Sequence, residues 1–184
     1  MSDPIQILLL EHKLILKVVH ALAVIDADLE QQRSVDPDMI RKIVEFMQVF
    51  ADKNHHTKEE DILFPALEAK GVPHMGCPLG GLAGEHVRGR ALVRALADAT
   101  DDYMQGEAAA VSDLRTVIGG ILQLYPNHIW KEDEMVFPMA ARFFSAAELH
   151  EIQQGFDKVQ KELDEKQEQF VEFAKVMEKL HAQQ

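Results

Sequence analysis

Cysteine is nearly absent from this chain of 184 residues, in which Cys77 is the only one. One thiol cannot form an internal disulfide. Nor can it supply the several thiolates of a structural zinc cluster or of an iron–sulfur cluster built from one chain. Such cysteine usage is typical of the reducing cytoplasm, and we therefore expect a cytoplasmic protein.

Long hydrophobic runs and basic clusters are missing as well. No window approaches the ~18 apolar residues needed to cross a bilayer. The short apolar run at 7–10 follows Asp3, where a signal peptide would carry positive charge. A formal net charge of −12 without a basic stripe argues against nucleic acid and anionic membrane as partners. We expect a soluble globular protein, because 47% of its residues are hydrophobic and 27% are charged.

Apolar residues repeat at helical spacing in five segments, and β-type alternation of apolar and polar residues is absent. Proline, glycine and capping residues mark the ends of these segments. The predicted helices cover approximately residues 5–32, 38–71, 79–106, 107–142 and 145–181, with a kink expected at Pro126. The fold class predicted is all-α: an up-down four-helix bundle over residues 1–144, with an additional C-terminal helix over 145–184 packed on its outside.

One motif occurs twice in the chain. Residues 55–65 read HHTKEEDILFP, and residues 127–138 read NHIWKEDEMVFP. Each copy places a histidine and a glutamate four residues apart, so the two side chains lie on the same helix face. Each copy also follows an earlier Glu-His pair by about forty residues. The ligands predicted from the inward stripes of four helices are His12, His56, Glu60, His86, His128 and Glu132.

Metal ions would explain this pattern. Two buried carboxylates without compensation would be costly, and bound cations remove that cost. Imidazole combined with carboxylate favours iron, manganese or zinc over calcium or magnesium. Six ligands shared by two ions, with Glu60 and Glu132 able to bridge them, leave open positions for water, O2 or peroxide.

In ligand order and spacing the chain resembles the hemerythrin-like proteins with the HHE cation-binding domain, over roughly residues 5–142. The resemblance rests on His12, then His56-x3-Glu60 followed by Leu-Phe-Pro, then His86, then His128-x3-Glu132 followed by Val-Phe-Pro. It implies a four-helix bundle around two iron ions, a non-haem di-iron centre that an oxo or hydroxo group can bridge. Hemerythrin itself has a second histidine four residues after the first in its third helix, where this chain has Arg90.

The resemblance also implies a range of functions. The leading expectation is that the metal pair binds or senses O2 or a related small oxidant such as peroxide or nitric oxide. The alternatives are a peroxidase-like or catalase-like enzyme, and a protein of iron homeostasis that acts in storage, repair or sensing. Homodimer formation or partner binding through the C-terminal helix is a further expectation.

Two assignments have alternatives. His55 and Glu59 could bind in place of their neighbours; the apolar stripe through Phe50 and Leu63 favours His56 and Glu60. In the second motif, Asp133 stands at His-x4-Asp spacing, which hemerythrin uses, but a regular helix would turn it away from His128.

Four further residues lie near the predicted ligands. Glu11 and Glu85 directly precede His12 and His86, and either solvent exposure or a contact with a ligand would suit them. Tyr125 lies one turn before His128, and we expect either a tyrosine of the core or a hydrogen-bond donor to an oxygen ligand of the metal. Gly89, one turn after His86, either leaves room beside the metal or permits close helix packing.

Overall fold

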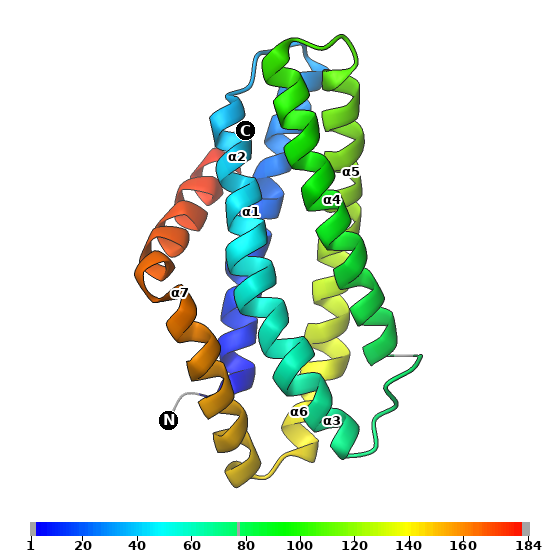
Figure 1. Ribbon diagram of the computed structural model, residues 1–184, viewed down its shortest axis with the longest axis vertical. Coiled ribbons are helices and arrows are strands. Elements are labelled where there is room, and N and C mark those ends of the chain that lie inside the picture. The colour runs from blue at the N-terminus through cyan, green and yellow to red at the C-terminus, as the bar shows by residue number, and fades with distance from the viewer. Residues whose placement is uncertain (1–2, 77, 182–184) are drawn as a thin grey trace.

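The computed structural model describes residues 3–76 and 78–181, so Cys77 lies outside the described residues. Helices form all the regular structure of this part of the chain, and no strand occurs in it. Four long helical segments run side by side, and α7 (Ala146–His181) lies along one flank (Figure 1). The predicted all-α bundle with an additional C-terminal helix is confirmed.

The first two long segments begin in the same way. At the start of α1 (Pro4–Glu30), Asp3 accepts a 3.0 Å hydrogen bond from the Ile5 N–H, and Asp36 caps the second segment likewise. Proline follows each cap, where its fixed φ suits a first helical turn. The second segment comprises α2 (Pro37–Phe46), the π-helical stretches η1 (Met47–His56) and η2 (Glu59–Leu63), and α3 (Phe64–Ala69).

The third and fourth segments are joined through Gly106, whose φ of +75° ends α4 (Leu79–Gln105) in a left-handed turn. The fourth segment comprises α5 (Ala110–Lys131), the π-helical η3 (Glu132–Val136) and α6 (Phe137–Phe143). It continues as an α-helix through Pro126, and its backbone departs from α-helical geometry at η3 instead.

A capping box opens α7: the Ser145 N–H donates to Glu148 Oε2 at 2.9 Å, and the Glu148 N–H donates to Ser145 Oγ at 3.4 Å. The helix packs mainly on α1 and η1. Its Gly155 permits close approach to η2, because a Cβ at that position would lie 3.1 Å from Ile62 Cδ1. The apolar face that α7 buries is formed by Ile152, Phe156, Leu163, Phe170, Ala174 and Met177.

A buried polar layer crosses the bundle between two apolar clusters. One cluster surrounds Leu22, Phe46 and Leu96, and the other surrounds Leu8 and Phe137. Between them lie buried polar and charged residues from all four long segments; these residues include His12, His55, His56, Lys58, Glu59, His86, His128 and Glu132. Layers of packed apolar side chains above and below therefore shield these groups from water.

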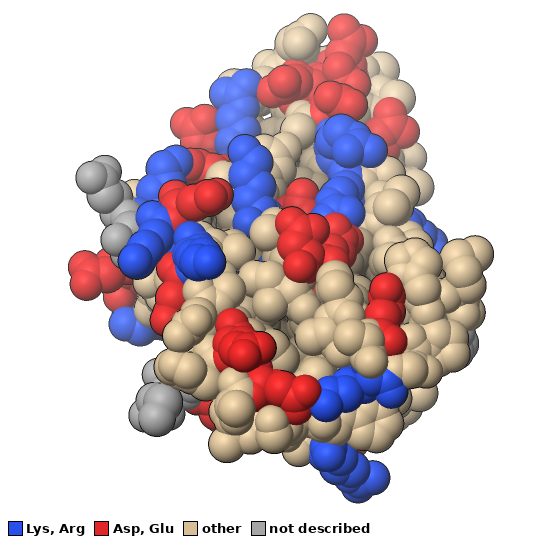
Figure 2. Space-filling view, turned by 60° about the horizontal axis from the view of Figure 1, so that its bottom comes forward, with Lys and Arg blue, Asp and Glu red and all other residues tan. Residues whose placement is uncertain are grey.

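The face of the molecule drawn in Figure 2 shows no comparable segregation. On the face presented in Figure 2, acidic and basic side chains are interspersed among uncharged ones. No helix within residues 3–76 and 78–181 is long and apolar enough to cross a membrane.

Candidate metal centre

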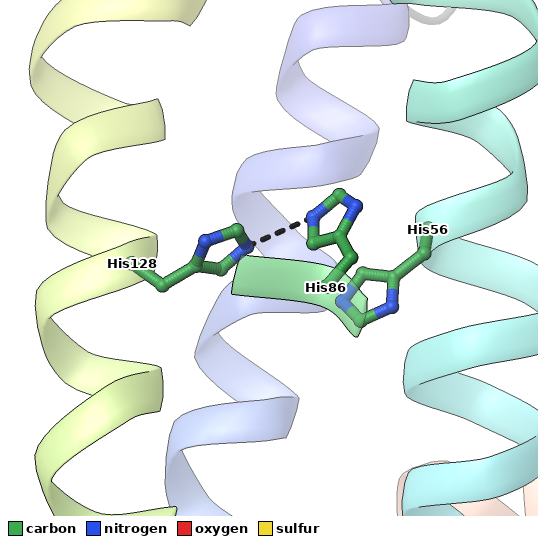
Figure 3. Close-up of side chains that lie close together, drawn as sticks. All are labelled: His56, His86 and His128. Carbon is green, nitrogen blue, oxygen red and sulfur yellow. Dashed lines mark hydrogen bonds between the residues drawn. The ribbon is translucent and has the colours of Figure 1, made fainter. Parts of the chain in front are cut away.

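Five buried histidines meet in the polar layer. His12 comes from α1, His55 and His56 from η1, His86 from α4 and His128 from α5, and none is more than 4% exposed. His56, His86 and His128 form a three-histidine group, whereas His12 and His55 form a two-histidine group beside two glutamates. In the three-histidine group, the Nε2 atoms of His86 and His128 lie 3.0 Å apart and the ring of His56 stacks on His86 (Figure 3).

Glu59 and Glu132 lie between these two groups, fully shielded from solvent. Glu59 directs Oε1 to His55 Nε2 and Oε2 to His86 Nε2, each at 3.5 Å. Glu132 places Oε1 3.5 Å from His86 Nε2, while its Oε2 lies 3.2 Å from the Nε2 atoms of both His12 and His128. None of the four oxygens has a hydrogen-bond partner among the described residues. Each carboxylate therefore spans both groups, as a ligand bridging two cations would.

Carboxylates also hold the outer nitrogen of every imidazole. The Nδ1 contacts are His12 to Asp133 at 2.6 Å, His55 to Glu11 at 3.0 Å, His56 to Asp52 at 3.2 Å, His86 to Glu60 at 2.7 Å and His128 to Glu85 at 3.0 Å. In a neutral imidazole that donates from Nδ1, the lone pair is on Nε2, the nitrogen that faces the centre. Metal-binding histidines are held in this way, and the carboxylate increases their basicity.

Three cations neutralise part of this outer shell. Lys58 binds Glu11, and Lys131 binds Glu85. The two lysines differ in burial: the Lys58 side chain is 0% exposed and also donates to Gln160 Oε1 of α7 at 2.8 Å, whereas Lys131 is 39% exposed. α7 therefore covers the outer shell of the two-histidine group.

Arg90 is the third cation and binds two carboxylates at once. Its Nε donates to Asp52 at 2.7 Å, and its two terminal nitrogens donate to Glu60 at 3.0 and 2.8 Å. Asp52 and Glu60 in turn accept from His56 and His86. One guanidinium thus fixes the orientation of two imidazoles of the three-histidine group.

The charges of these side chains leave an excess of four negative charges. Two central glutamates and five outer carboxylates contribute seven negative charges, and Lys58, Arg90 and Lys131 contribute three positive ones. Two divalent cations between neutral imidazoles would cancel the difference. The donor set, the orphaned oxygens and the charge excess therefore all fit a pair of metal ions.

The pKa shifts show how the metal-free centre compensates. Burial lowers the pKa of His55 to about 4 and that of His56 to about 3, which keeps both imidazoles neutral. Burial opposes protonation of His12, but contacts with Asp133 and Glu132 outweigh it and raise the pKa to about 9. Burial, together with the charge of Glu132, raises the pKa of Glu59 well above its usual value. The raised pKa values of His12 and Glu59 thus favour protonation beside the positions where a metal ion would provide positive charge.

Five of the six predicted ligands lie in the two groups, namely His12, His56, His86, His128 and Glu132. The sixth, Glu60, lies outside: its side chain is 27% exposed and binds Arg90 and the Nδ1 of His86. The structure places Glu59 at the centre in its stead and adds His55.

The reason for this difference is the π-helical backbone of η1 and η2. A π-helix has more residues per turn than an α-helix, so a stripe counted at 3.6 residues drifts off the true inward face. Both His55 and His56 turn inward, and Glu59 follows one turn after His55.

A signal for His55 and Glu59 was present in the sequence. Aligned on their Phe-Pro pairs, the two motifs match His55 with His128, Lys58 with Lys131 and Glu59 with Glu132. The contacts follow the same twofold relation, since Phe64 stacks on His86 as Phe137 stacks on His12. His56 has no histidine counterpart, because Ile129 follows His128.

The remaining candidates have defined positions. Asp133 and the Glu11 and Glu85 carboxylates lie in the outer shell, each on an imidazole Nδ1. Gly89 leaves room for Tyr125: a Cβ on Gly89 would lie 3.0 Å from the Tyr125 hydroxyl oxygen. The space beside Gly89 is therefore filled by the tyrosine.

Comparison with known proteins agrees with this geometry. The family model described as the hemerythrin HHE cation binding domain matches residues 3–140. No curated protein and no solved structure matches the chain. The matched segment covers α1 to α6 up to Ala140 and contains every residue of the two histidine groups.

Proposed function

Because the chain belongs to the hemerythrin HHE cation-binding family, we propose that its buried centre holds two iron ions and binds or senses O2 or a related small oxidant. The observation that carries the proposal is the placement of Glu59 and Glu132, whose four shielded oxygens reach both histidine groups without another partner. Manganese or zinc would suit the same donors, so the identity of the metal is part of the proposal.

The residues divide unequally between the two ions. His56, His86 and His128 would hold one ion and His12 and His55 the other, with both glutamates shared. The two-histidine group offers one imidazole fewer, so an ion held there would leave more room for an exogenous ligand. Iron bound there would supply reversible redox chemistry with O2, peroxide or nitric oxide.

The chain itself contributes orientation and exclusion of water. Outer carboxylates hold each imidazole with Nε2 inward, so little reorganisation is needed when a metal binds. Phe64 and Phe137 stack on His86 and His12, and both belong to the apolar cluster around Leu8 that closes the polar layer on that side. On the two-histidine side, α7 covers Lys58 and, through it, Glu11. A shielded site of this kind suits binding or sensing, because water and larger reductants are kept from the ions.

Metal analysis of protein purified without oxygen tests the proposal, followed by optical spectra as O2 and then peroxide are added. We expect about two iron ions per chain and a spectral change that reverses when O2 is removed. Sustained consumption of peroxide would instead establish the enzymatic alternative. A chain that folds but takes up no metal would refute the proposal.

A further inference from the structure

The two halves of the centre are related by the internal repeat, but three positions break the relation. His56 corresponds to Ile129, Arg90 corresponds to Leu16, and Asp52 corresponds to Tyr125 when the Glu-His pairs and the His-x3-Glu motifs are aligned. The central ligands and their lysines are otherwise matched between the halves. A departure confined to one side of a repeated site indicates a property that only that side has.

These departures converge on one pocket. A cavity of about 240 Å³ lies among η1, α4 and α5. Its lining residues are Met47, Gln48, Asp52, Lys53, His56, Arg90, Val93, Arg94 and Tyr125. The pocket therefore reaches the three-histidine group at His56, a residue without a histidine counterpart in the other half.

The hydrogen-bonding groups of the pocket are mostly donors. Lys53 and Arg94 are exposed, and neither forms an ion pair with another described residue. Arg90 adds a third cation, already engaged with Asp52 and Glu60. Lys53, Arg90 and Arg94 together outnumber the two carboxylates paired with Arg90, Asp52 and Glu60, by one charge. This leaves a small local positive excess at the mouth of the pocket in a chain whose net charge is −12. Such an excess raises the local concentration of anions.

Tyr125 supplies a further donor inside the pocket. The residue is 4% exposed, and no described residue hydrogen-bonds its hydroxyl. Gly89 is needed for this position, because a Cβ there would lie 3.0 Å from the hydroxyl oxygen. A hydroxyl that lines a pocket can donate a hydrogen bond into it. An acceptor atom entering the pocket would receive this hydrogen bond.

We propose that this pocket is a binding site for a small oxyanion, held by Lys53 and Arg94 at its mouth and by the Tyr125 hydroxyl within. The volume is below that of pockets for drug-sized ligands, which restricts the occupant to a few heavy atoms. Inorganic oxyanions and short carboxylic acids share this chemistry. The apolar side chains of Met47 and Val93 would add contacts for the latter alone.

An anion in this pocket would affect the metal centre through the carboxylates that support its imidazoles. Arg90 lines the pocket and orients Asp52 and Glu60, which hold His56 and His86. An anion beside Arg90 competes with these carboxylates for the guanidinium and thereby alters the support of two imidazoles. The bound oxyanion would therefore be an effector of the three-histidine group, and it would act without binding to a metal ion itself.

Isothermal titration of the full-length protein with nitrite and, separately, with acetate tests the site, with metal content measured on the same preparation. Arg94→Ala and Lys53→Ala should each weaken binding several-fold at low ionic strength. Tyr125→Phe, which keeps the ring, should weaken it by about 2-fold to 13-fold, the range for one hydrogen bond. Tighter binding of acetate would identify a carboxylic acid as the natural class, and tighter binding of nitrite an inorganic oxyanion.

The control is Arg88→Ala, which removes an exposed arginine from the same helix outside the pocket. Its affinity should match that of the unaltered protein. If Arg88→Ala loses as much anion affinity as Arg94→Ala, the anions respond only to surface charge and the proposal is wrong. The proposal is also wrong if Tyr125→Phe and Arg94→Ala both keep the affinity of the unaltered protein. The metal content of the same preparation distinguishes the failure of the anion site from the failure of the proposed function. A metal-loaded protein that binds no anion refutes the anion site alone. A protein that binds the anion but takes up no metal refutes the metal centre alone.

Discussion

Replacing Glu59 by glutamine should have opposite consequences with and without metal. In the metal-free protein, burial and the neighbouring charge of Glu132 raise the pKa of Glu59 and so favour its uncharged form. Glutamine has nearly the same shape and no charge, so the melting temperature of the metal-free form should change by less than about 2 °C, since no buried charge is gained or lost. In the metal-loaded protein the same substitution removes a ligand whose oxygens face both histidine groups.

The size of the loss follows from mass action. A metal present at a thousand times its dissociation constant stabilises the folded state by about 4 kcal/mol. For a chain of this length, 1 kcal/mol corresponds to about 2–4 °C in melting temperature. Glu59→Gln should therefore lower the melting temperature of the metal-loaded protein by about 8–16 °C for each ion lost.

Glu60→Gln is the matched control, since it alters the neighbouring carboxylate that supports His86 from outside. Loss of such a support typically weakens metal affinity about 10-fold to 100-fold without removing a ligand. Excess metal should restore two ions per chain in this variant but not in Glu59→Gln. Calorimetric melting with and without a chelator, together with metal analysis, distinguishes them. If Glu60→Gln loses its metal irreversibly while Glu59→Gln keeps both ions, the assignment of the central carboxylate is wrong.

Two further predictions concern the outer shell and proton release. Lys58→Met should lower the free energy of unfolding by about 3 kcal/mol or more, because the buried Glu11 loses its cation. Lys131→Met, at the half-exposed equivalent position, should lower it by less than about 1 kcal/mol. Equal losses in urea titrations would contradict the role given to burial under α7. Metal uptake near pH 7 should release the proton of His12, and the raised pKa of Glu59 favours release of a further one; calorimetry in buffers of different ionisation enthalpy measures the number. The folded pKa of His12 is raised to about 9, so the stability that its protonated imidazole gives the metal-free protein is complete below about pH 6.5 and is lost as the pH rises through 9. Metal affinity should increase over the same pH range, because the metal then competes with fewer protons. Metal uptake without proton release would refute this protonation pattern.

Burial separates the outer-shell pairs into two classes that the sequence does not distinguish. Glu11 with Lys58 and Glu85 with Lys131 occupy equivalent places in the repeat, yet only the first pair is covered by α7. The covered pair supports His55, in the two-histidine group, where we propose that an exogenous ligand binds. The exposed pair supports His128 and remains open to solvent. The repeat thus provides two similar half-sites, and α7 makes their surroundings different.

Hydrophobic periodicity and the repeated motif were sufficient to predict the helical bundle. Apolar residues at helical spacing, with Asp-Pro starts and glycine ends, define helices independently of their neighbours. The same periodicity placed His12, His86, His128 and Glu132 in the core correctly, because α1, α4 and α5 are regular up to those residues.

Only the tertiary structure placed Glu59, and not Glu60, between the two histidine groups and showed that His55 and His56 are both buried. A π-helical backbone widens the turn at η1 and η2, and periodicity counted at 3.6 residues cannot register this change. The sequence marked Glu11 and Glu85 as possible contacts of a ligand, but it could not show which histidine each outer carboxylate contacts, since all these pairs except Asp52 with His56 are distant along the chain. Packing of four helices brings these pairs together, because contacts between helices depend on how the helices are rotated and spaced, and local sequence fixes only the faces they present.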